Sequence, residues 1–449
     1  MSWPRFHVLP YQADAGGYFA CLRDLPWPVW LDSGRPALSS GRYDILAADP
    51  AETLVIGAAT APDAAQDAPR ELLGTPQRAV PDLPFAGGLI GFASYELGRQ
   101  WQGLQAAAGP RLADDLRAGL YDWALVIDHQ RQTATLVGAG RAQQTRDRWD
   151  ALLQRLAGVS DAQAATQPAA ELLSLGLDET AYAQGFERIQ HYIREGDTYQ
   201  VNFTRRLQAR SHEDAWSLYR RLRTLSPAPY GAFLDYGDYQ VLSNSPEQFV
   251  SLADGRVQTR PIKGTRPRGH TPQEDARLRA DLGASDKDRA ENLMIVDLLR
   301  NDLGRVCEPG SIEVPQLFGI ESYATVHHLV STVTGRLAAG RDAIDLLQAC
   351  FPGGSITGAP KRRAMQIIDE LEPVSRELYC GSVFRLGFDG NLDSSISIRT
   401  ALKSGEELFY WAGGGIVADS QCEAEYQESL DKAAAFFRLL GITPPRAGV

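Results

Sequence analysis

The sequence predicts an α+β protein, either one large unit or two closely packed domains. Short apolar runs bounded by turn residues, such as YDWALVIDHQ (121–130) and TATLVG (133–138), indicate β-strands in the N-terminal part. Helical periodicity appears in the C-terminal part, over about 286–303, 360–371 and 420–440. The N-terminal part is therefore expected to be mainly sheet with few long helices, and the C-terminal part is expected to mix strands and helices.

The C-terminal helices are separated by a segment with strand character. In the second helix, apolar residues recur at i, i+3, i+4 and i+7 after Pro360, and proline suits a first helical position. The third helix has the same apolar repeat. Between them, residues 394–420 predict two strands and a glycine turn.

Two stretches rich in Ala, Asp, Gln and Pro look like connecting segments without a periodic apolar face. They cover 58–70 and 156–171. The second stretch predicts a division into an N-terminal region, 1–160, and a C-terminal catalytic domain, 175–440.

Composition excludes several classes of function. The 449 residues are 44% hydrophobic and 22% charged, which is enough for a large core. A net charge of −11 without a long basic run argues against a nucleic-acid partner.

No stretch approaches about 18 uninterrupted apolar residues, and the start lacks a signal-peptide pattern, so a soluble cytoplasmic protein is expected. Five widely separated cysteines argue against a disulfide framework or a structural zinc site.

Two of the predicted helices carry carboxylates on one face. Asp288 and Glu291 are three residues apart in the first, and Glu425, Glu428 and Lys432 follow helical spacing in the third. By spacing alone such acids fit a solvated helix face better than a cation site. If the two helices faced each other, their carboxylates could hold Mg²⁺ and leave positions for a substrate.

A lysine lies within a basic segment, TRPIKGTRPRG (259–269). The segment places Lys263 among Arg260, Arg266 and Arg268, and neighbouring cations lower a lysine pKa. Such a lysine can act as a neutral nucleophile near pH 7. A basic loop that binds an anion, or is merely exposed, explains the same residues.

Two further motifs contain candidate acid–base groups. Glu247 follows a Ser-Pro turn signal in SNSPEQF (243–249), where a strand could end and present the carboxylate to a cleft. His327 and His328 lie in a strand-like run, so alternation directs them to opposite faces. One can line a cleft while the other is structural.

Two glycine-rich segments could bring backbone N–H groups close to an anion. FPGGSITGAPK (351–361) leads into a helix but lacks the spacing of a Walker A loop. WAGGGIVADS (411–420) offers three consecutive glycines, which fit carboxylate binding and a tight hairpin equally well.

The order of these motifs resembles one family throughout, the chorismate-utilizing enzymes. The matching motifs are SPEQF, PIKGTRPRG, DRAENLMIVDLLRNDLGRV, HHLVSTVTG, FPGGSITGAPK, SIRTA and GGGIVADS, with GGLIGFASYELG and PWPVWLDSG extending the match toward the N-terminus. The family includes component I of anthranilate synthase and of aminodeoxychorismate synthase, isochorismate synthases and salicylate synthases. The resemblance implies a fold of two mixed α+β subdomains that form a β-sandwich core with helices outside.

The resemblance also implies a Mg²⁺ cofactor and a set of site residues. Glu291 and Glu428 match the principal Mg²⁺ carboxylates, and Glu425 and Asp288 match outer acids, although relatives commonly carry Glu at position 288. His328 matches a histidine near the departing C4 hydroxyl of chorismate. The residues matched to substrate binding are Ser355, Tyr379, Arg399, Gly413, Gly414, Gly415 and Lys432.

Two positions separate the branches of the family. Water-adding members carry a lysine base where this chain has Gln200, and an amide cannot act as a base near neutral pH. Anthranilate synthases read PIAGT where this chain and aminodeoxychorismate synthases read PIKGT, which contains Lys263. The resemblance therefore implies that Lys263 attacks C2, that Glu247 protonates the leaving hydroxyl, and that ammonia then gives 4-amino-4-deoxychorismate for 4-aminobenzoate and folate synthesis.

The resemblance implies a partner as well. No cysteine lies in a glycine-flanked nucleophile turn with a plausible His and Glu dyad, so a glutamine amidotransferase subunit is expected to supply ammonia. Relatives bind tryptophan near WLDSG and SPAPYG, for which Ser33 and Tyr230 are candidate contacts. Anthranilate synthase component I is the alternative enzyme, and a regulatory protein that binds chorismate or tryptophan without catalysis is the alternative of another class.

Overall fold

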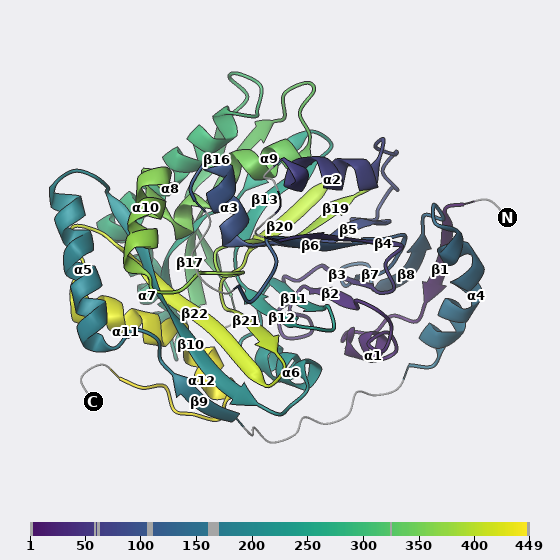
Figure 1. Cartoon of the computed structure of the whole chain (residues 1–449), viewed down its shortest axis with the longest axis horizontal. Coiled ribbons are helices and arrows are strands. Elements are labelled where there is room, and N and C mark those ends of the chain that lie inside the picture. Colours follow the sequence, from purple (N-terminus) through teal and green to yellow (C-terminus); the bar gives the residue numbers. More distant parts are fainter. Residues whose placement is uncertain are drawn as a thin grey trace.

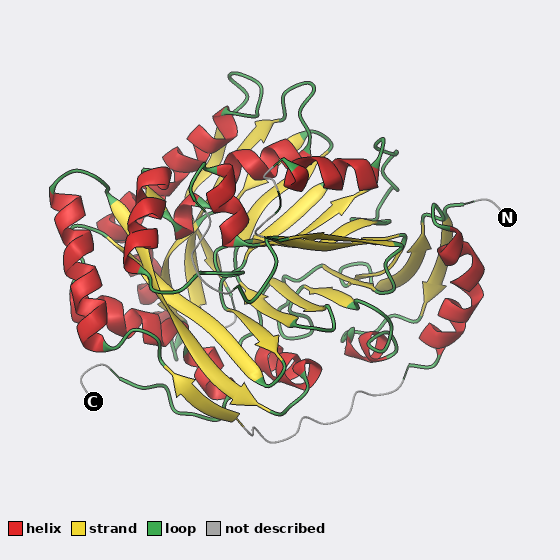
Figure 2. Cartoon of the chain, in the orientation of Figure 1, coloured by secondary structure: helices red, strands yellow, loops and turns green. Residues whose placement is uncertain are grey.

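Two antiparallel sheets, of twelve and ten strands, form the centre of the molecule (Figure 2). They belong to a computed structural model that describes residues 3–57, 60, 63–105, 111–159, 170–323 and 326–446. Helices lie outside the sheets, as Figure 1 shows, and this arrangement confirms the predicted α+β class with a β-sandwich core.

The twelve-stranded sheet has the order β1-β8-β7-β3-β2-β11-β12-β21-β22-β10-β18, with β9 also paired to β10. Its strands are β1 (Arg5–Leu9), β2 (Val29–Asp32), β3 (Tyr43–Ala47), β7 (Trp123–Asp128), β8 (Thr133–Gly138), β9 (Ala170–Ser174), β10 (Gln200–Ser211), β11 (Tyr230–Asp235), β12 (Gln240–Ser245), β18 (Gly358–Ala359), β21 (Thr400–Ser404) and β22 (Glu407–Ile416).

The ten-stranded sheet has the order β15-β17-β14-β13-β20-β19-β5-β6-β4, with β16 also paired to β17. Its strands are β4 (Glu52–Ile56), β5 (Gly88–Ala93), β6 (Leu116–Tyr121), β13 (Gln248–Ala253), β14 (Arg256–Thr259), β15 (Ile262–Pro267), β16 (Glu313–Ser322), β17 (Val326–Arg336), β19 (Ser382–Gly387) and β20 (Leu392–Ile396).

The helices divide between the outer faces of the two sheets. They are α1 (Gly16–Ala20), α2 (Ala64–Leu73), α3 (Tyr95–Trp101), α4 (Gln143–Ala157), α5 (Glu179–Arg194), α6 (Ala215–Leu225), α7 (Pro272–Ala284), α8 (Asp286–Gly304), α9 (Ala343–Cys350), α10 (Lys361–Leu371), α11 (Cys422–Lys432) and α12 (Ala434–Leu439), with a 3₁₀ turn η1 (Gly354–Ile356). No helix in the described part of the chain is long and apolar enough to span a membrane.

Alternating side chains of the large sheet build two separate cores. Val241 of β12 and Phe409 of β22 belong to the core shared with the ten-stranded sheet. Their neighbours Leu242 and Tyr410 belong to the core beneath the outer helices, which include α5, α6 and α11. Because side chains alternate across a strand, one sheet can serve both cores.

Both halves of the chain contribute to both sheets. The N-terminal strand β2 pairs with β11, and the N-terminal strand β5 pairs with β19. Strands from the two predicted regions therefore lie next to each other in each sheet. The boundaries 1–160 and 175–440 stay a prediction, and residues 160–169 between them lie outside the described part.

The structure confirms the first two predicted C-terminal helices and corrects the third. Residues 420–440 form two helices, α11 and α12, which meet at Ala433, where φ is −88° and ψ is 0°. This change of direction allows Phe436 to stack on Tyr410, with ring centroids 4.7 Å apart. In α10, Pro360 precedes the first helical residue and is not part of the helix.

The expected two strands and glycine turn over 394–420 are confirmed by β21, β22 and a turn at Gly405, whose φ of +57° favours glycine. Of the two readings of the glycines at 413–415, the tight hairpin is wrong, because these glycines lie within β22. The expectation that 58–70 has no periodic apolar face was also wrong. The segment 58–70 contains the start of α2, where Ala65, Ala68 and Leu72 face the core. Alanine is weakly apolar, so the helical repeat of this face was not visible in the sequence.

A buried ion pair joins the helices around the Gly-rich segment 351–361. The Lys361 Nζ atom donates to Asp302 Oδ2 at 2.6 Å and to the Cys350 carbonyl at 2.9 Å. The two side chains are 7% and 1% exposed, so neither charge is well solvated. This pair connects α10, α8 and the end of α9.

Replacing Lys361 with methionine is expected to lower the free energy of unfolding by about 3–5 kcal/mol, because it leaves the Asp302 carboxylate buried without a partner. Urea titration followed by circular dichroism measures this change. The matched control is Arg300→Ala, which breaks the exposed Arg300–Asp297 pair of the same helix and should cost less than about 1 kcal/mol. Equal losses in the two variants would contradict the structural role of the buried pair.

Candidate functional site

Lys263 lies on β15, where a glycine lets the strand approach α8. Gly264 has a φ of +80°, and a Cβ atom on it would lie 2.8 Å from Cγ of Asp288. Any larger residue would push the strand away from the helix. The Lys263 Nζ atom donates to the Ser355 carbonyl at 3.2 Å, which links β15 to η1.

Burial lowers the pKa of Lys263. The carboxylates of Glu291, Glu247 and Glu428 oppose this shift, whereas the positive charge of Lys432 adds to it. Loss of water around an ammonium group favours the neutral amine. The amine is therefore more available as a nucleophile than that of a solvated lysine.

The neighbouring arginines do not cause this shift, which corrects the expectation from the sequence. Each is held by a carboxylate from another element: Arg260 by Glu321, Arg266 by Asp288 and Arg268 by Asp275. The local excess of positive charge is thereby neutralised, and burial remains the main cause.

Glu247 lies at the end of β12, as the Ser-Pro signal predicted. The Glu247 backbone N–H donates to Ser245 Oγ at 3.2 Å, and the Ser355 hydroxyl donates to Glu247 Oε1 at 3.4 Å. Burial raises the pKa of Glu247 to about 7, although Lys263 opposes the shift. A carboxyl group with this pKa can hold a proton near neutral pH and donate it to a leaving group.

The acids of α11 lie against the glycines of β22. A Cβ atom on Gly414 would lie 3.0 Å from Oε2 of Glu425 and 3.4 Å from Oε1 of Glu428, so glycine leaves room for both carboxylates. Lys432 pairs with Glu428 at 2.7 Å and donates to the Gly413 carbonyl at 3.0 Å. The three glycines therefore have a packing role in a strand and are not a hairpin turn.

Glu291 of α8 belongs to the same electrostatic environment. Burial raises its pKa, Lys263 opposes this effect, and the negative charges of Asp288 and Glu428 add to it. Glu428 shows the opposite shift. Its side chain is half exposed, and the positive charges of Lys432 and Lys263 outweigh its partial loss of water and lower its pKa. Glu291 of α8 and Glu428 of α11 therefore both interact electrostatically with Lys263.

These carboxylates fit a hard cation that also binds a substrate. Within the described ranges, no three acidic, imidazole or thiol side chains are arranged as a metal site by themselves. Mg²⁺ is commonly held by one or two carboxylates together with water and substrate oxygens, which suits Glu291 and Glu428. Asp288 is paired with Arg266 at 2.8 Å, and Glu425 accepts a hydrogen bond from Ser420 at 2.6 Å.

The two histidines occupy different environments on β17. His327 is held by Ser322 at 2.7 Å and Asp275 at 3.0 Å, which is a structural arrangement. His328 Nδ1 lies 2.9 Å from the Thr265 hydroxyl, and burial lowers the pKa of His328 to about 4. Its imidazole is neutral at physiological pH. Thr265 was not singled out in the sequence, although it lies in the PIKGT motif.

Two predicted substrate contacts lie near this histidine and β10. The positive charge of Arg399 contributes to the lowered pKa of His328, so the two side chains are close. Arg399 has no carboxylate partner in the described part of the chain. Burial raises the pKa of Tyr379 well above its usual value, which keeps the hydroxyl a hydrogen-bond donor. Both groups can bind a carboxylate.

Gln200 begins β10 beside β22. It is 1% exposed, and neither its amide nitrogen nor its amide oxygen has a hydrogen-bond partner among the described residues. A Cβ atom on Gly415 would lie 2.7 Å from the Gln200 Nε2 atom. A buried amide without partners is costly, so a bound molecule is expected to satisfy it.

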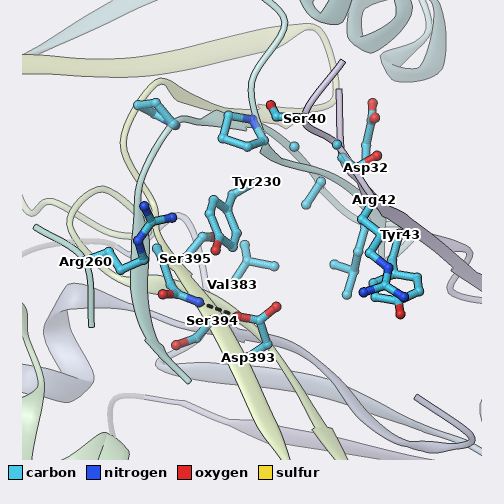
Figure 3. Close-up of a pocket in the computed structure, with 18 of the residues that line it drawn as sticks. Asp32, Ser40, Arg42, Tyr43, Tyr230, Arg260, Val383, Asp393, Ser394 and Ser395 are labelled. Carbon is cyan, nitrogen blue, oxygen red and sulfur yellow. Dashed lines mark hydrogen bonds between the residues drawn. The ribbon is translucent and has the colours of Figure 1, made fainter. Parts of the chain in front are cut away.

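Ser33 and Tyr230 line a separate cavity of about 320 Å³. Figure 3 shows the Tyr230 ring directed into this cavity, which also contains Arg260 and Asp393. The Ser33 hydroxyl donates to Asp44 at 2.7 Å. Ile262 lines the cavity and precedes Lys263, so the cavity and the lysine share β15.

The chain is similar in sequence and in fold to known proteins. A family model described as chorismate binding enzyme matches residues 28–438. Aminodeoxychorismate synthase component 1 of Salmonella typhimurium is 46% identical over 448 residues, 96% of each chain, and its Escherichia coli counterpart is 42% identical, covering 97% of this chain and 98% of that one. The structure of anthranilate synthase component I from Streptococcus pneumoniae matches with a TM-score of 0.79 and 31% identity, over 88% of this chain and 92% of that one.

The family match covers most of the sequence and includes every candidate site residue described above. The fold, with two antiparallel sheets and outer helices, agrees with the matched structure. The chain belongs to the family of chorismate binding enzymes.

Proposed function

We propose that this chain is the chorismate-aminating component of an aminodeoxychorismate synthase. The observation that carries this proposal is the partly buried Lys263 of the PIKGT motif, linked through Ser355 to the protonatable Glu247. Similarity over nearly the whole chain to relatives named aminodeoxychorismate synthase component 1 supports it. The reaction would convert chorismate and ammonia to 4-amino-4-deoxychorismate for 4-aminobenzoate and folate synthesis.

Glu291 and Glu428 are proposed to hold Mg²⁺, with Glu425 and Asp288 as outer acids. Bound Mg²⁺ would supply a positive charge for the ring carboxylate of chorismate and draw electron density from the ring. Arg399, Tyr379 and the glycines of β22 would hold the enolpyruvyl carboxylate.

Lys263 is proposed to form a covalent bond with C2 of chorismate. Its neutral amine attacks C2, the ring double bonds shift, and the bond from C4 to its hydroxyl breaks. Glu247 donates the proton with which the hydroxyl leaves as water, and the neutral His328 is proposed to lie beside the leaving group. Burial favours the two protonation states that this step needs, a neutral amine and a protonated carboxyl group.

Ammonia is proposed to attack C4 in the second step, and the bond between Lys263 and C2 then breaks. The enolpyruvyl group is untouched in both steps, so the product retains it. Gln200 contributes an amide and no base, which disfavours addition of water at C2.

A glutamine amidotransferase subunit is proposed to supply the ammonia in the cytoplasm. The relatives are named as component 1, which supports a second component. We also propose that the cavity lined by Ser33 and Tyr230 binds tryptophan, since the Tyr230 ring points into it and offers an aromatic face to the indole.

The purified chain, given chorismate, Mg²⁺ and ammonium at alkaline pH, is expected to form 4-amino-4-deoxychorismate. Alkaline pH raises the concentration of neutral ammonia and of neutral Lys263. Mass spectrometry and the ultraviolet spectrum identify the product. Anthranilate together with pyruvate would establish the alternative enzyme, and no turnover would favour a regulatory protein.

Glutamine serves as the control nitrogen source in the same assay. The isolated chain should form no aminated product from glutamine until the amidotransferase subunit is added. Robust use of glutamine by the chain alone would show a second active site that this account lacks.

The variants Glu291→Gln and Glu428→Gln should each lower kcat/KM for chorismate by about 10² to 10³-fold, because metal stabilisation of charge is worth several kcal/mol. The fold should stay intact, as circular dichroism can verify. Steady-state kinetics over a Mg²⁺ titration measures the loss.

The matched control for these variants is Glu423→Gln, an exposed acid on the same α11 helix. It should retain the activity and Mg²⁺ dependence of the original chain. Near-normal turnover of Glu291→Gln or Glu428→Gln at limiting Mg²⁺ would remove that residue from the metal site.

A further inference from the structure

Arg376 is a completely buried cation in the segment between α10 and β19. It is 1% exposed, and its guanidinium donates to both carboxylate oxygens of Glu372, at 2.9 and 2.6 Å. It also donates to the carbonyls of Ile356 at 3.0 Å and Asn202 at 2.6 Å. Two of these four hydrogen bonds are local, and the other two connect this segment to η1 and to β10.

Two of these segments carry a predicted substrate contact, and the third, β10, pairs with the strand that carries three of them. The carbonyl on η1 belongs to the residue after Ser355. Asn202 of β10 pairs with Gly415 of β22 and lies two residues from the unpartnered Gln200. The backbone N–H of Tyr379 donates to the Arg376 carbonyl at 2.8 Å.

Glu372 extends this network along β10. Its Oε1 atom accepts hydrogen bonds from the backbone N–H and the hydroxyl of Thr204, both at 2.9 Å. Thr204 pairs with Gly413 across the sheet. The ion pair therefore holds β10 at two positions, opposite the first and the last of the three glycines.

A guanidinium group suits this position better than any other cation. Its planar fork makes the bidentate pair with Glu372 and still has donors for two carbonyls, whereas an ammonium group is a single point with three donors. The ring of Tyr95 lies 4.8 Å from Arg376 Cζ and the ring of Tyr379 lies 5.9 Å from it. Both rings offer faces that favour a cation.

We propose that Arg376 is a positioning residue for chorismate. It fixes η1, β10 and the turn before Tyr379 relative to one another, so that Ser355, Tyr379 and the β22 glycines meet the substrate together. Arg376 itself does not touch the reacting atoms. This inference rests on chorismate as the substrate, as proposed above.

The test compares Arg376→Lys and Glu372→Gln with the original chain. Each variant should raise KM for chorismate by about tenfold or more, because small displacements of binding groups weaken binding strongly. KM for ammonium should stay within about twofold, since ammonia binds after the ring is held. Stabilisation of the protein by added chorismate, read from thermal melting, should shrink in parallel.

Arg221→Lys is the control. Arg221 lies on α6, a helix without predicted site residues, and forms a largely buried ion pair with Glu213, which precedes the helix. It should lower the melting temperature and leave KM for chorismate unchanged. Unchanged KM in folded Arg376→Lys and Glu372→Gln would overturn the inference. If Arg376→Lys fails to fold, the KM of Glu372→Gln for chorismate decides whether the inference holds. An original chain that makes no aminated product would instead contradict the proposed function.

Discussion

Partial removal of the Lys263 ammonium group from water sets the conditions for the whole site. In a solvated position the surrounding carboxylates would keep this lysine protonated, but burial opposes them and lowers its pKa. The same burial raises the pKa of Glu247 to about 7. Burial therefore favours both a neutral Lys263 amine, which can act as a nucleophile, and a protonated Glu247 carboxyl group, which can act as an acid.

The two-sheet fold makes this burial possible. Lys263 lies on a strand of the ten-stranded sheet, the glycines of β22 lie on the twelve-stranded sheet, and α8 and α11 bring acids from the two outer helix layers. Glycine at 264 and at 414 allows each helix to come close to a strand. Arg376 and Glu372 then join the segments behind the substrate contacts. The site thus depends on close packing between elements from distant parts of the sequence.

Most of the site residues could be predicted because they lie in long motifs that occur in a fixed order. The causes of their properties could not, because they depend on tertiary contacts. The arginines beside Lys263 are neutralised by acids from α7, α8 and β16, which no local pattern reveals. The break at Ala433 accompanies stacking of Phe436 on Tyr410, a tertiary contact, and the alanine face of α2 is too weakly apolar to indicate a helix. Arg376 lies outside the motifs, so only its contacts identify it.

A direct measurement of the Lys263 pKa tests this account most sharply. The chain has only five lysines, so ¹³C-lysine labelling gives a simple NMR spectrum: Lys263, Lys287, Lys361, Lys403 and Lys432. The Lys263 signal, assigned by its absence in Lys263→Arg, should titrate clearly below the ordinary lysine value of 10.5 in the folded chain and return to that value when the chain is unfolded in urea. Titration of the folded-state signal at or above 10.5 would contradict a neutral nucleophile held by burial.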